Sequence, residues 1–392
     1  MADNKSKFVP DDVIFEILTW LPPETLIRLK TVCKLWNSTI CDSKFISKHR
    51  SNFGDSRRNK NNIGRIIIPT TSIRFGSFNI HKTFVLPEHN LRATFENVEF
   101  VNDSEGPLSL TIYGSCNGVL CCMSGSNHLM VCNPCIGRSI LIPNSPSRCF
   151  HFRGDFGIGY DSERNDYKIV NMTEKCLAHV SIAEVFSLKS NSWKEIESPV
   201  KEIGLPWREL FIVGMSIYIS GFIHWLCTSL NKSKILRFDV ANEVFSEMEL
   251  PMEIDRWRYG VASIAEANGL LSLTVLKKYP DIFEVWTMNE YGVLGSWIRR
   301  FEGRVPHHSK IVSIGLTIEC KIMMCLLSFR VTSSGFLRQY NNKWNREAKE
   351  NILLAVVDLK TPNRVYSTRL LDYPYHRMLA FKASLELLDY VA

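Results

Sequence analysis

Residues 238–251 read Phe-Asp-Val-Ala-Asn-Glu-Val-Phe-Ser-Glu-Met-Glu-Leu-Pro, and this stretch decides the fold because versions of it recur along the chain. Each version has an apolar segment, a polar turn, a second apolar segment and often a proline. Alternating apolar and polar residues predict strands with one buried face. The other versions begin at Val131, Val185, Val285 and Val357. Residues 65–370 contain no long amphipathic helical pattern, so an all-β region is predicted there.

The spacing of these versions indicates the architecture. Their turn residues are Gly137, Asn191, Asn242, Gly295 and Asn363, which lie 54, 51, 53 and 68 residues apart in turn. Repeats of about 40–50 residues built from short strands are typical of β-propellers, in which one repeat forms roughly one four-stranded blade. Radial stacking then buries the apolar face that a single blade leaves open. A possible earlier copy over residues 77–87 raises the predicted count to six blades, and a β-sandwich is the alternative.

Two further patterns support short hairpins between these versions. Asn117-Gly118 and Asn268-Gly269 each stand between apolar runs, and residues 162–166 separate two strand-like segments. Residues 210–230 carry no formal charge, and an uncharged stretch of this length could cross a membrane. Ser220-Gly221 is a turn signal within that stretch, so two buried strands are predicted and a membrane span is not.

Residues 8–46 follow a different pattern, that of short amphipathic helices. Pro10 suits the first turn of a helix, and Asp11 and Asp12 complement the positive end of its dipole. Pro22 and Pro23 end that helix and open the next. About 40 residues rarely bury enough surface to fold alone, so these helices either cap the following domain or bind a partner. A closed propeller has its own core and little need of helices to cap it. The second alternative, that the helices bind a partner, is therefore favoured.

The N-terminal segment resembles the F-box, the module that binds the Skp-type adaptor of Skp–cullin–F-box ubiquitin ligases. Val9 and Ser43 depart from the family pattern, where Leu and Pro are common. The matching residues are Pro10-Asp11-Asp12, Glu16-Ile17-Leu18, Leu21-Pro22, Leu26, Arg28, Val32-Cys33-Lys34, Trp36, Ile40 and Phe45-Ile46. The adaptor-binding residues that the resemblance and the apolar pattern predict are Val9, Pro10, Asp11, Ile14, Ile17, Leu18, Leu21, Pro22, Leu26, Leu29, Val32, Cys33 and Trp36.

Most of residues 65–370 resemble the F-box-associated domain of plant F-box proteins, which is related to kelch-type propellers. The resemblance rests on Ser115-Cys116-Asn117-Gly118, Asn133-Pro134, Gly159-Tyr160-Asp161, Asn165-Asp166-Tyr167-Lys168, Asn191-Ser192-Trp193 and His224-Trp225-Leu226. It implies a flowering-plant source and an architecture shared with the S-locus F-box proteins. The predicted fold is therefore α + β in two domains. A helical F-box spans 5–50, a basic polar linker 51–64, and a six-bladed kelch-like propeller 65–392.

Composition fits an ordinary soluble protein. The 392 residues are 45% hydrophobic and 22% charged. Residues 1–65 hold a net charge of +5 out of +7, and this basic excess is predicted to be a solvated linker rather than a nucleic-acid surface. The polar first ten residues do not form a signal peptide, and twelve cysteines without one indicate a reducing compartment. Cytoplasm, nucleus or both are the expected locations.

Catalytic and metal sites are not predicted. Cys132 and Cys135 have metal-ligand spacing, with Cys116, Cys121, Cys122 and His128 nearby, but equivalent turns of other repeats lack cysteine. These residues are predicted to be free thiols, with no metal and no cofactor. Residues 161–165 resemble the start of a calcium loop, but Asp166 occupies the position that needs glycine. Phosphate-binding loops and nucleophile elbows are absent from the sequence, so the chain is not expected to be an enzyme.

The tryptophans divide into two groups. Trp193, Trp225, Trp286 and Trp297 recur at equivalent repeat positions and are predicted to pack between blades. Two aromatic–arginine pairs outside the repeats suit protein recognition and are the predicted substrate-binding residues: Trp207, Arg208, Trp257 and Arg258.

The expected function is substrate recognition in a Skp–cullin–F-box ubiquitin ligase. The expected partners are the Skp-type adaptor, cullin through it, and a protein target marked for degradation. The alternatives are a scaffold that binds the adaptor without a ligase, and a ligand-binding or enzymatic propeller with a vestigial F-box.

Overall fold

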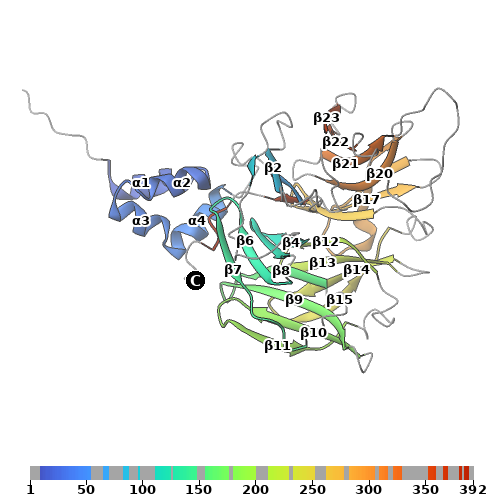
Figure 1. Cartoon of the computed structure of the whole chain (residues 1–392), viewed down its shortest axis with the longest axis horizontal. Coiled ribbons are helices and arrows are strands. Elements are labelled where there is room, and N and C mark those ends of the chain that lie inside the picture. The colour runs from blue at the N-terminus through green and yellow to red at the C-terminus, as the bar shows by residue number, and fades with distance from the viewer. Residues whose placement is uncertain are drawn as a thin grey trace, which may run out of the picture.

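The fold consists of four short helices at one end of the molecule and a ring of β-sheets beside them (Figure 1). The structure is a computed structural model that describes residues 9–53, 65–69, 83–87, 96–97, 111–124, 127–147, 155–175, 180–199, 211–228, 233–251, 262–277, 282–304, 309–316, 321–328, 352–358, 365–369, 379–381 and 384–387.

Each of the first three helices begins directly after a proline or a cysteine. Pro10 precedes α1, and Pro22 precedes α2, which has Pro23 in its first turn. The Sγ of Cys33 accepts a hydrogen bond from the Trp36 N–H at the start of α3. The bounds are α1 Asp11–Leu18, α2 Pro23–Leu29, α3 Lys34–Ile40 and α4 Ser43–Phe53.

Helix α4 extends into the segment predicted to be a linker. Its residues 51–53 are helical, and the buried Asn52 side chain donates a hydrogen bond to Thr19 Oγ1 at 2.9 Å. Residues 51–53 therefore belong to the helical domain, because a buried amide needs a fixed partner. The rest of the predicted linker, residues 54–64, lies outside the described residues.

Over the described residues, the strands form six four-stranded units, which we number as blades one to six. Each unit is an antiparallel meander, except that blade one includes the last strand of the chain. Blade one contains β1 Arg65–Pro69, β2 Thr83–Pro87, β3 Glu96–Asn97 and β24 Leu379–Phe381; blade two contains β4 Thr111–Cys116, β5 Val119–Met123, β6 Leu129–Asn133 and β7 Arg138–Leu141; blade three contains β8 Asp155–Asp161, β9 Asp166–Lys175, β10 Val180–Ser187 and β11 Ser192–Ile196.

The remaining blades follow the same order and confirm the predicted all-β propeller after a helical N-terminal domain. Residues 329–351 lie between β21 and β22, which accounts for the long last step of the repeat. Blade four contains β12 Phe211–Ile219, β13 Phe222–Thr228, β14 Ser233–Asp239 and β15 Val244–Met248; blade five contains β16 Ala262–Ala267, β17 Leu270–Lys277, β18 Ile282–Met288 and β19 Trp297–Arg304; blade six contains β20 Ser309–Leu316, β21 Lys321–Ser328, β22 Ile352–Asp358 and β23 Val365–Arg369.

Tight turns join the first two strands of several blades, as the Asn-Gly pairs predict. Asn117 and Gly118 have φ values of 49° and 83°, the left-handed pair that a two-residue hairpin of type I′ requires. Strands β12 and β13 meet at a similar turn and occupy most of the charge-free stretch. Among the described residues, no helix is long and apolar enough to cross a membrane.

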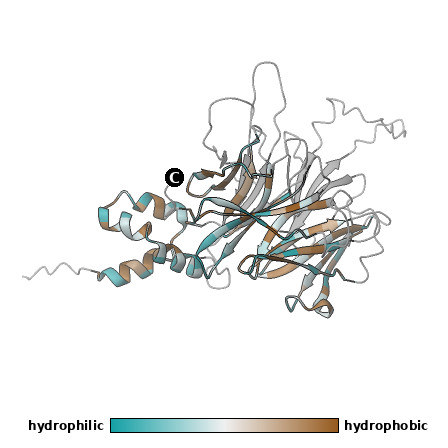
Figure 2. Ribbon diagram, turned by 90° about the horizontal axis from the view of Figure 1, so that it is seen from below, coloured by the Kyte–Doolittle hydropathy of each residue, from teal (hydrophilic) through white to brown (hydrophobic). Residues whose placement is uncertain are grey.

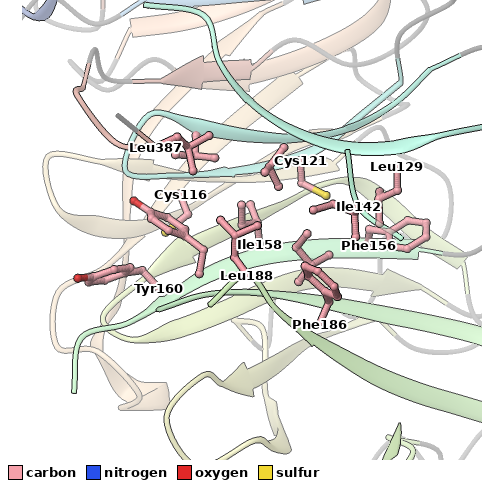
Figure 3. Close-up of a cluster of buried hydrophobic side chains, with 14 residues drawn as sticks. Cys116, Cys121, Leu129, Ile142, Phe156, Ile158, Tyr160, Phe186, Leu188 and Leu387 are labelled. Carbon is pink, nitrogen blue, oxygen red and sulfur yellow. The ribbon is translucent and has the colours of Figure 1, made fainter. Parts of the chain in front are cut away.

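Apolar clusters lie between neighbouring blades. Figure 3 shows the cluster shared by blades two and three, where Phe156 and Ile158 of β8 face Cys121 and Leu129. The tryptophans at the repeat positions pack in such clusters, as predicted. Trp225 lies between blades three and four, Trp286 and Trp297 lie between blades four and five, and Trp193 packs on the cluster of Figure 3.

Close to the ring axis, the first strands of blades two and four touch. Ser216 and Ile217 of β12 pair in parallel with Gly114 and Ser115 of β4, and Ser216 Oγ donates to the Tyr113 carbonyl at 3.0 Å. A Cβ at Gly114 would lie 2.1 Å from Ser216 Oγ, so only glycine fits there. This contact joins blades two and four into one eight-stranded sheet.

The C-terminal part of the chain closes the ring. Strand β24 pairs with β1, with Leu379 opposite Ile67 and Phe381 opposite Arg65. Residues 384–387 follow this strand, and Leu385 among them packs against the helices.

Candidate protein-docking surface

Large apolar side chains are exposed on the helices more densely than on the blades. Six of the eleven such residues in the described part of the chain fall between residues 9 and 35. Figure 2 shows apolar stretches in these helices, which stand away from the blades. We define the docking surface as Val9 (48% exposed), Val13 (46%), Ile17 (54%), Trp20 (36%), Val32 (60%) and Leu35 (56%).

The helical periodicity of α1 explains how its docking residues come together. Val13 and Ile17 are four residues apart and therefore lie on one face of the helix, and Val9 precedes them by the same interval. Leu18 is the next residue after Ile17, so its side chain points about 100° away around the helix axis, and it is buried. Helix α1 thus has two apolar faces, and only one of them is covered in this chain.

The covered faces form a small core. It consists of Leu18, Leu26, Ile40, Phe45 and Ile46, all less than 5% exposed, together with Leu385 from the far end of the sequence. Phe15 meets Phe45 edge-on, with ring centroids 5.2 Å apart. The helices therefore hold their shape before any partner arrives.

His49 on α4 supports the end of α1 from inside this core. The side chain is 2% exposed, and its Nε2–H donates to the Leu21 carbonyl at 2.9 Å. Burial lowers the pKa of His49 to about 4, although the bond to Leu21 acts in the opposite direction. The imidazole is consequently neutral at pH 7 and stays compatible with the apolar surroundings.

The predicted adaptor-binding residues separate into three groups. Val9, Pro10, Asp11, Ile17, Val32 and Cys33 are exposed, and Ile14, Leu21, Pro22, Leu29 and Trp36 are half-buried. Leu18 and Leu26 form the third group, because both side chains are buried in the helical core, and their role in adaptor binding stays a prediction.

Three exposed apolar residues were missing from the prediction: Val13, Trp20 and Leu35. The four-residue interval from Val9 through Val13 to Ile17 is the signal that could have identified Val13. The predicted substrate-binding residues Trp207, Arg208, Trp257 and Arg258 lie outside the described residues, so they stay a prediction.

The cysteines considered as metal ligands lie in blade two as thiols. Cys122 Sγ and Cys132 Sγ are 3.5 Å apart, and Cys116 and Cys121 are also buried and form no disulfide. Burial raises the pKa of Cys121 well above its usual value, which keeps that thiol protonated. Within the described ranges, no three His, Cys, Asp or Glu side chains are grouped so that they could hold a metal ion.

Comparison with known proteins places both parts of the chain in one family. Residues 9–48 match the F-box domain, and residues 65–352 match the F-box associated beta propeller domain. The F-box protein CPR1 of Arabidopsis thaliana is 27% identical over 339 residues, which cover 78% of this chain and 75% of CPR1. The F-box/kelch-repeat protein At3g23880 of the same plant is 25% identical over 324 residues, 79% of this chain and 80% of the relative.

Among solved structures, TolB from Acinetobacter baumannii aligns with a TM-score of 0.46 at 9% identity, over 87% of this chain and 73% of TolB. The names of both plant relatives include an F-box, and one of them also includes kelch repeats. This chain belongs to the plant F-box proteins that carry an F-box-associated β-propeller domain.

Proposed function

We propose that this protein is the substrate-recognition subunit of a Skp–cullin–F-box ubiquitin ligase. The observation that carries the proposal is the docking surface, an apolar face left uncovered on helices that already have a core of their own. Large apolar residues exposed together mark sites where another protein binds. The F-box match supports a Skp-type adaptor as the protein that binds there.

The docking surface is large enough to contribute a substantial share of the binding energy. Covering a fully exposed Val, Leu or Ile side chain contributes about 1.5–3 kcal/mol, and the surface offers five of these residues and a tryptophan, which are between 36% and 60% exposed. Association itself costs about 4–15 kcal/mol. A standard interface of roughly 800 Å² on each partner that covers these residues would therefore yield a stable complex.

The propeller is the part we propose to bind the target protein. Its blades bury their apolar faces against each other and so form a rigid platform separate from the docking surface. Holding the target's lysines near a charged ubiquitin-conjugating enzyme accelerates transfer by proximity alone. The proposal therefore assigns no catalytic residue to this chain and places its action in the cytoplasm or the nucleus.

Val32→Asp tests the proposal at the most exposed position of the docking surface. We expect the substitution to weaken binding of a purified Skp-type adaptor at least about tenfold, because a buried carboxylate at the interface would lack a partner. Titration calorimetry measures the affinity. Val244→Asp is the matched control, since Val244 on β15 is also a valine and is 54% exposed. Leu18→Asp is unsuitable, because it would disrupt the helical core.

Two outcomes would contradict the proposal. The first is folded wild-type protein that binds no Skp-type adaptor. The second is equal adaptor affinity for the Val32→Asp and Val244→Asp variants, which would place the interface elsewhere. Recovery of cullin with the adaptor separates a ligase subunit from a scaffold that binds the adaptor alone.

A further inference from the structure

Residues 384–387 lie buried between the F-box helices and the propeller. Ser384, Leu385, Glu386 and Leu387 are exposed by 8%, 1%, 4% and 0%. These residues belong to no helix or strand, and segments of this kind usually run over the protein surface. Four successive buried residues in such a segment therefore call for an explanation.

Leu385 completes the core of the F-box. It packs in the same cluster as Leu18, Leu26 and Phe45, and Ile136 from the β6–β7 turn packs on that cluster as well. The F-box core is thus built from both ends of the sequence and contacts blade two directly.

Leu387 enters the propeller instead. It lies in the cluster between blades two and three, near Cys116 in Figure 3. Its φ of 70° is in the left-handed region, which a branched aliphatic residue avoids. Such backbone strain persists only where the surroundings fix it, so the packing on both sides of the turn determines this conformation.

Glu386 connects the two domains by charge. Its Oε1 accepts from Arg50 Nε at 2.7 Å, and its Oε2 accepts from Arg50 Nη2 at 3.3 Å and from the Tyr167 hydroxyl at 2.6 Å. Arg50 belongs to α4 and also lies over the Tyr160 ring of blade three, 4.1 Å from its centroid. A bidentate pair of this kind fixes orientation as well as distance.

Asn133 anchors the backbone of the same segment to blade two. Its Nδ2 donates to the Ser384 carbonyl at 3.0 Å, to Ser384 Oγ at 3.1 Å and to the Glu386 carbonyl at 2.9 Å. Its Oδ1 accepts from the Cys135 N–H at 3.0 Å. The Asn133 side chain is fully buried, so these bonds are shielded from water.

We propose that residues 384–387 form a clamp that locks the F-box helices onto blades two and three in a single orientation. The clamp joins three structures at one place: the helical core through Leu385, α4 and blade three through Glu386, and the propeller core through Leu387. The existence of the clamp does not depend on the proposed function. Its consequence rests on that function: an adaptor and a target that are both bound to the locked chain are held at a fixed separation.

Hydrogen exchange of the full-length protein tests the clamp. We expect Leu385→Ala and Glu386→Gln each to raise the exchange rate of the α4 amides about tenfold or more, because the helices lose a core residue or a partly buried charge pair. Glu302→Gln is the matched control, since Glu302 pairs with Arg299 at 2.9 Å on the surface. It should leave the α4 amides unchanged.

Small-angle scattering of a chain ending at Ala383 supplies the second measurement. Without the clamp the two domains should move apart, so the maximum dimension should rise. Unchanged α4 exchange in both substituted proteins would overturn the clamp, and this result remains decisive if the shortened chain fails to fold. A wild-type protein that binds no Skp-type adaptor would refute the proposed function, whereas the exchange results judge the clamp separately.

Discussion

Single buried side chains connect the blades, and Lys168 is the clearest case. Its Nζ is nearly inaccessible to solvent and lies 3.0 Å from Asp161 Oδ2, 2.9 Å from Glu243 Oε1 and 2.9 Å from the Val240 carbonyl. These partners belong to blade three and to the β14–β15 turn of blade four. Burial would raise the pKa of Asp161, but hydrogen bonds from Arg164 and Lys168 outweigh it and lower the pKa to about 2.

We expect Lys168→Met to lower the free energy of unfolding by about 2–4 kcal/mol, because it leaves buried carboxylates with fewer counter-charges. Lys194→Met is the matched control, since Lys194 pairs with the same Glu243 at 2.8 Å but is 71% exposed. Lys194→Met should lower the free energy of unfolding by less than about 1 kcal/mol. Urea denaturation of the two variants measures both values, and equal losses would show that Lys168 is not a buried connector.

At the scale of elements, the repeat predicted the blades because hairpin turns and strand alternation are local properties. The repeat did not predict the conformation of each turn residue or the length of every connection. Asn242 lies in the turn of the β14–β15 hairpin, as predicted, and it is the next residue, Glu243, that takes the left-handed conformation with φ of 58°. Gly295 lies within a short 3₁₀ turn, Leu294–Ser296, that lengthens the β18–β19 connection.

The docking surface was harder to predict than the blades, because apolar spacing does not say which face of a helix is covered. Both faces of α1 are apolar, so Leu18 in the core and Ile17 on the surface look alike in the sequence. Which face of α1 is covered depends on residues that are far away in the sequence, among them Leu385. No local pattern could have linked Leu385 to a helix at the other end of the chain.

The contact between β4 and β12 leads to a prediction about strand pairing. A Cβ on Gly114 would lie 2.7 Å from the Ser216 carbonyl oxygen, and a backbone atom cannot rotate away as a side chain can. We expect Gly114→Ala to lower the free energy of unfolding by about 1–3 kcal/mol. Gly295→Ala should change it by no more than about 0.5 kcal/mol, because open space surrounds that position. Thermal unfolding of the two variants checks the difference.

At the scale of the whole molecule, the ring depends on its last strand. A chain ending at Met378 would lack β24 and leave the β1 edge that pairs with it open. We expect this chain to melt at a lower temperature than one ending at Ala383, and to associate through the exposed edge. Calorimetry and size-exclusion chromatography compare the two. Identical melting and elution would show that β24 does not close the ring.

The place of Leu385 in the F-box core also governs when the protein becomes competent during its synthesis. The helices leave the ribosome first, but one of their core residues, Leu385, is added only after every strand of the propeller. At about 5–20 residues per second, the helices wait roughly 20–80 seconds for it. A chain terminated before Leu385 would therefore carry an F-box with a gap in its core, so only chains that extend past this residue present that domain complete.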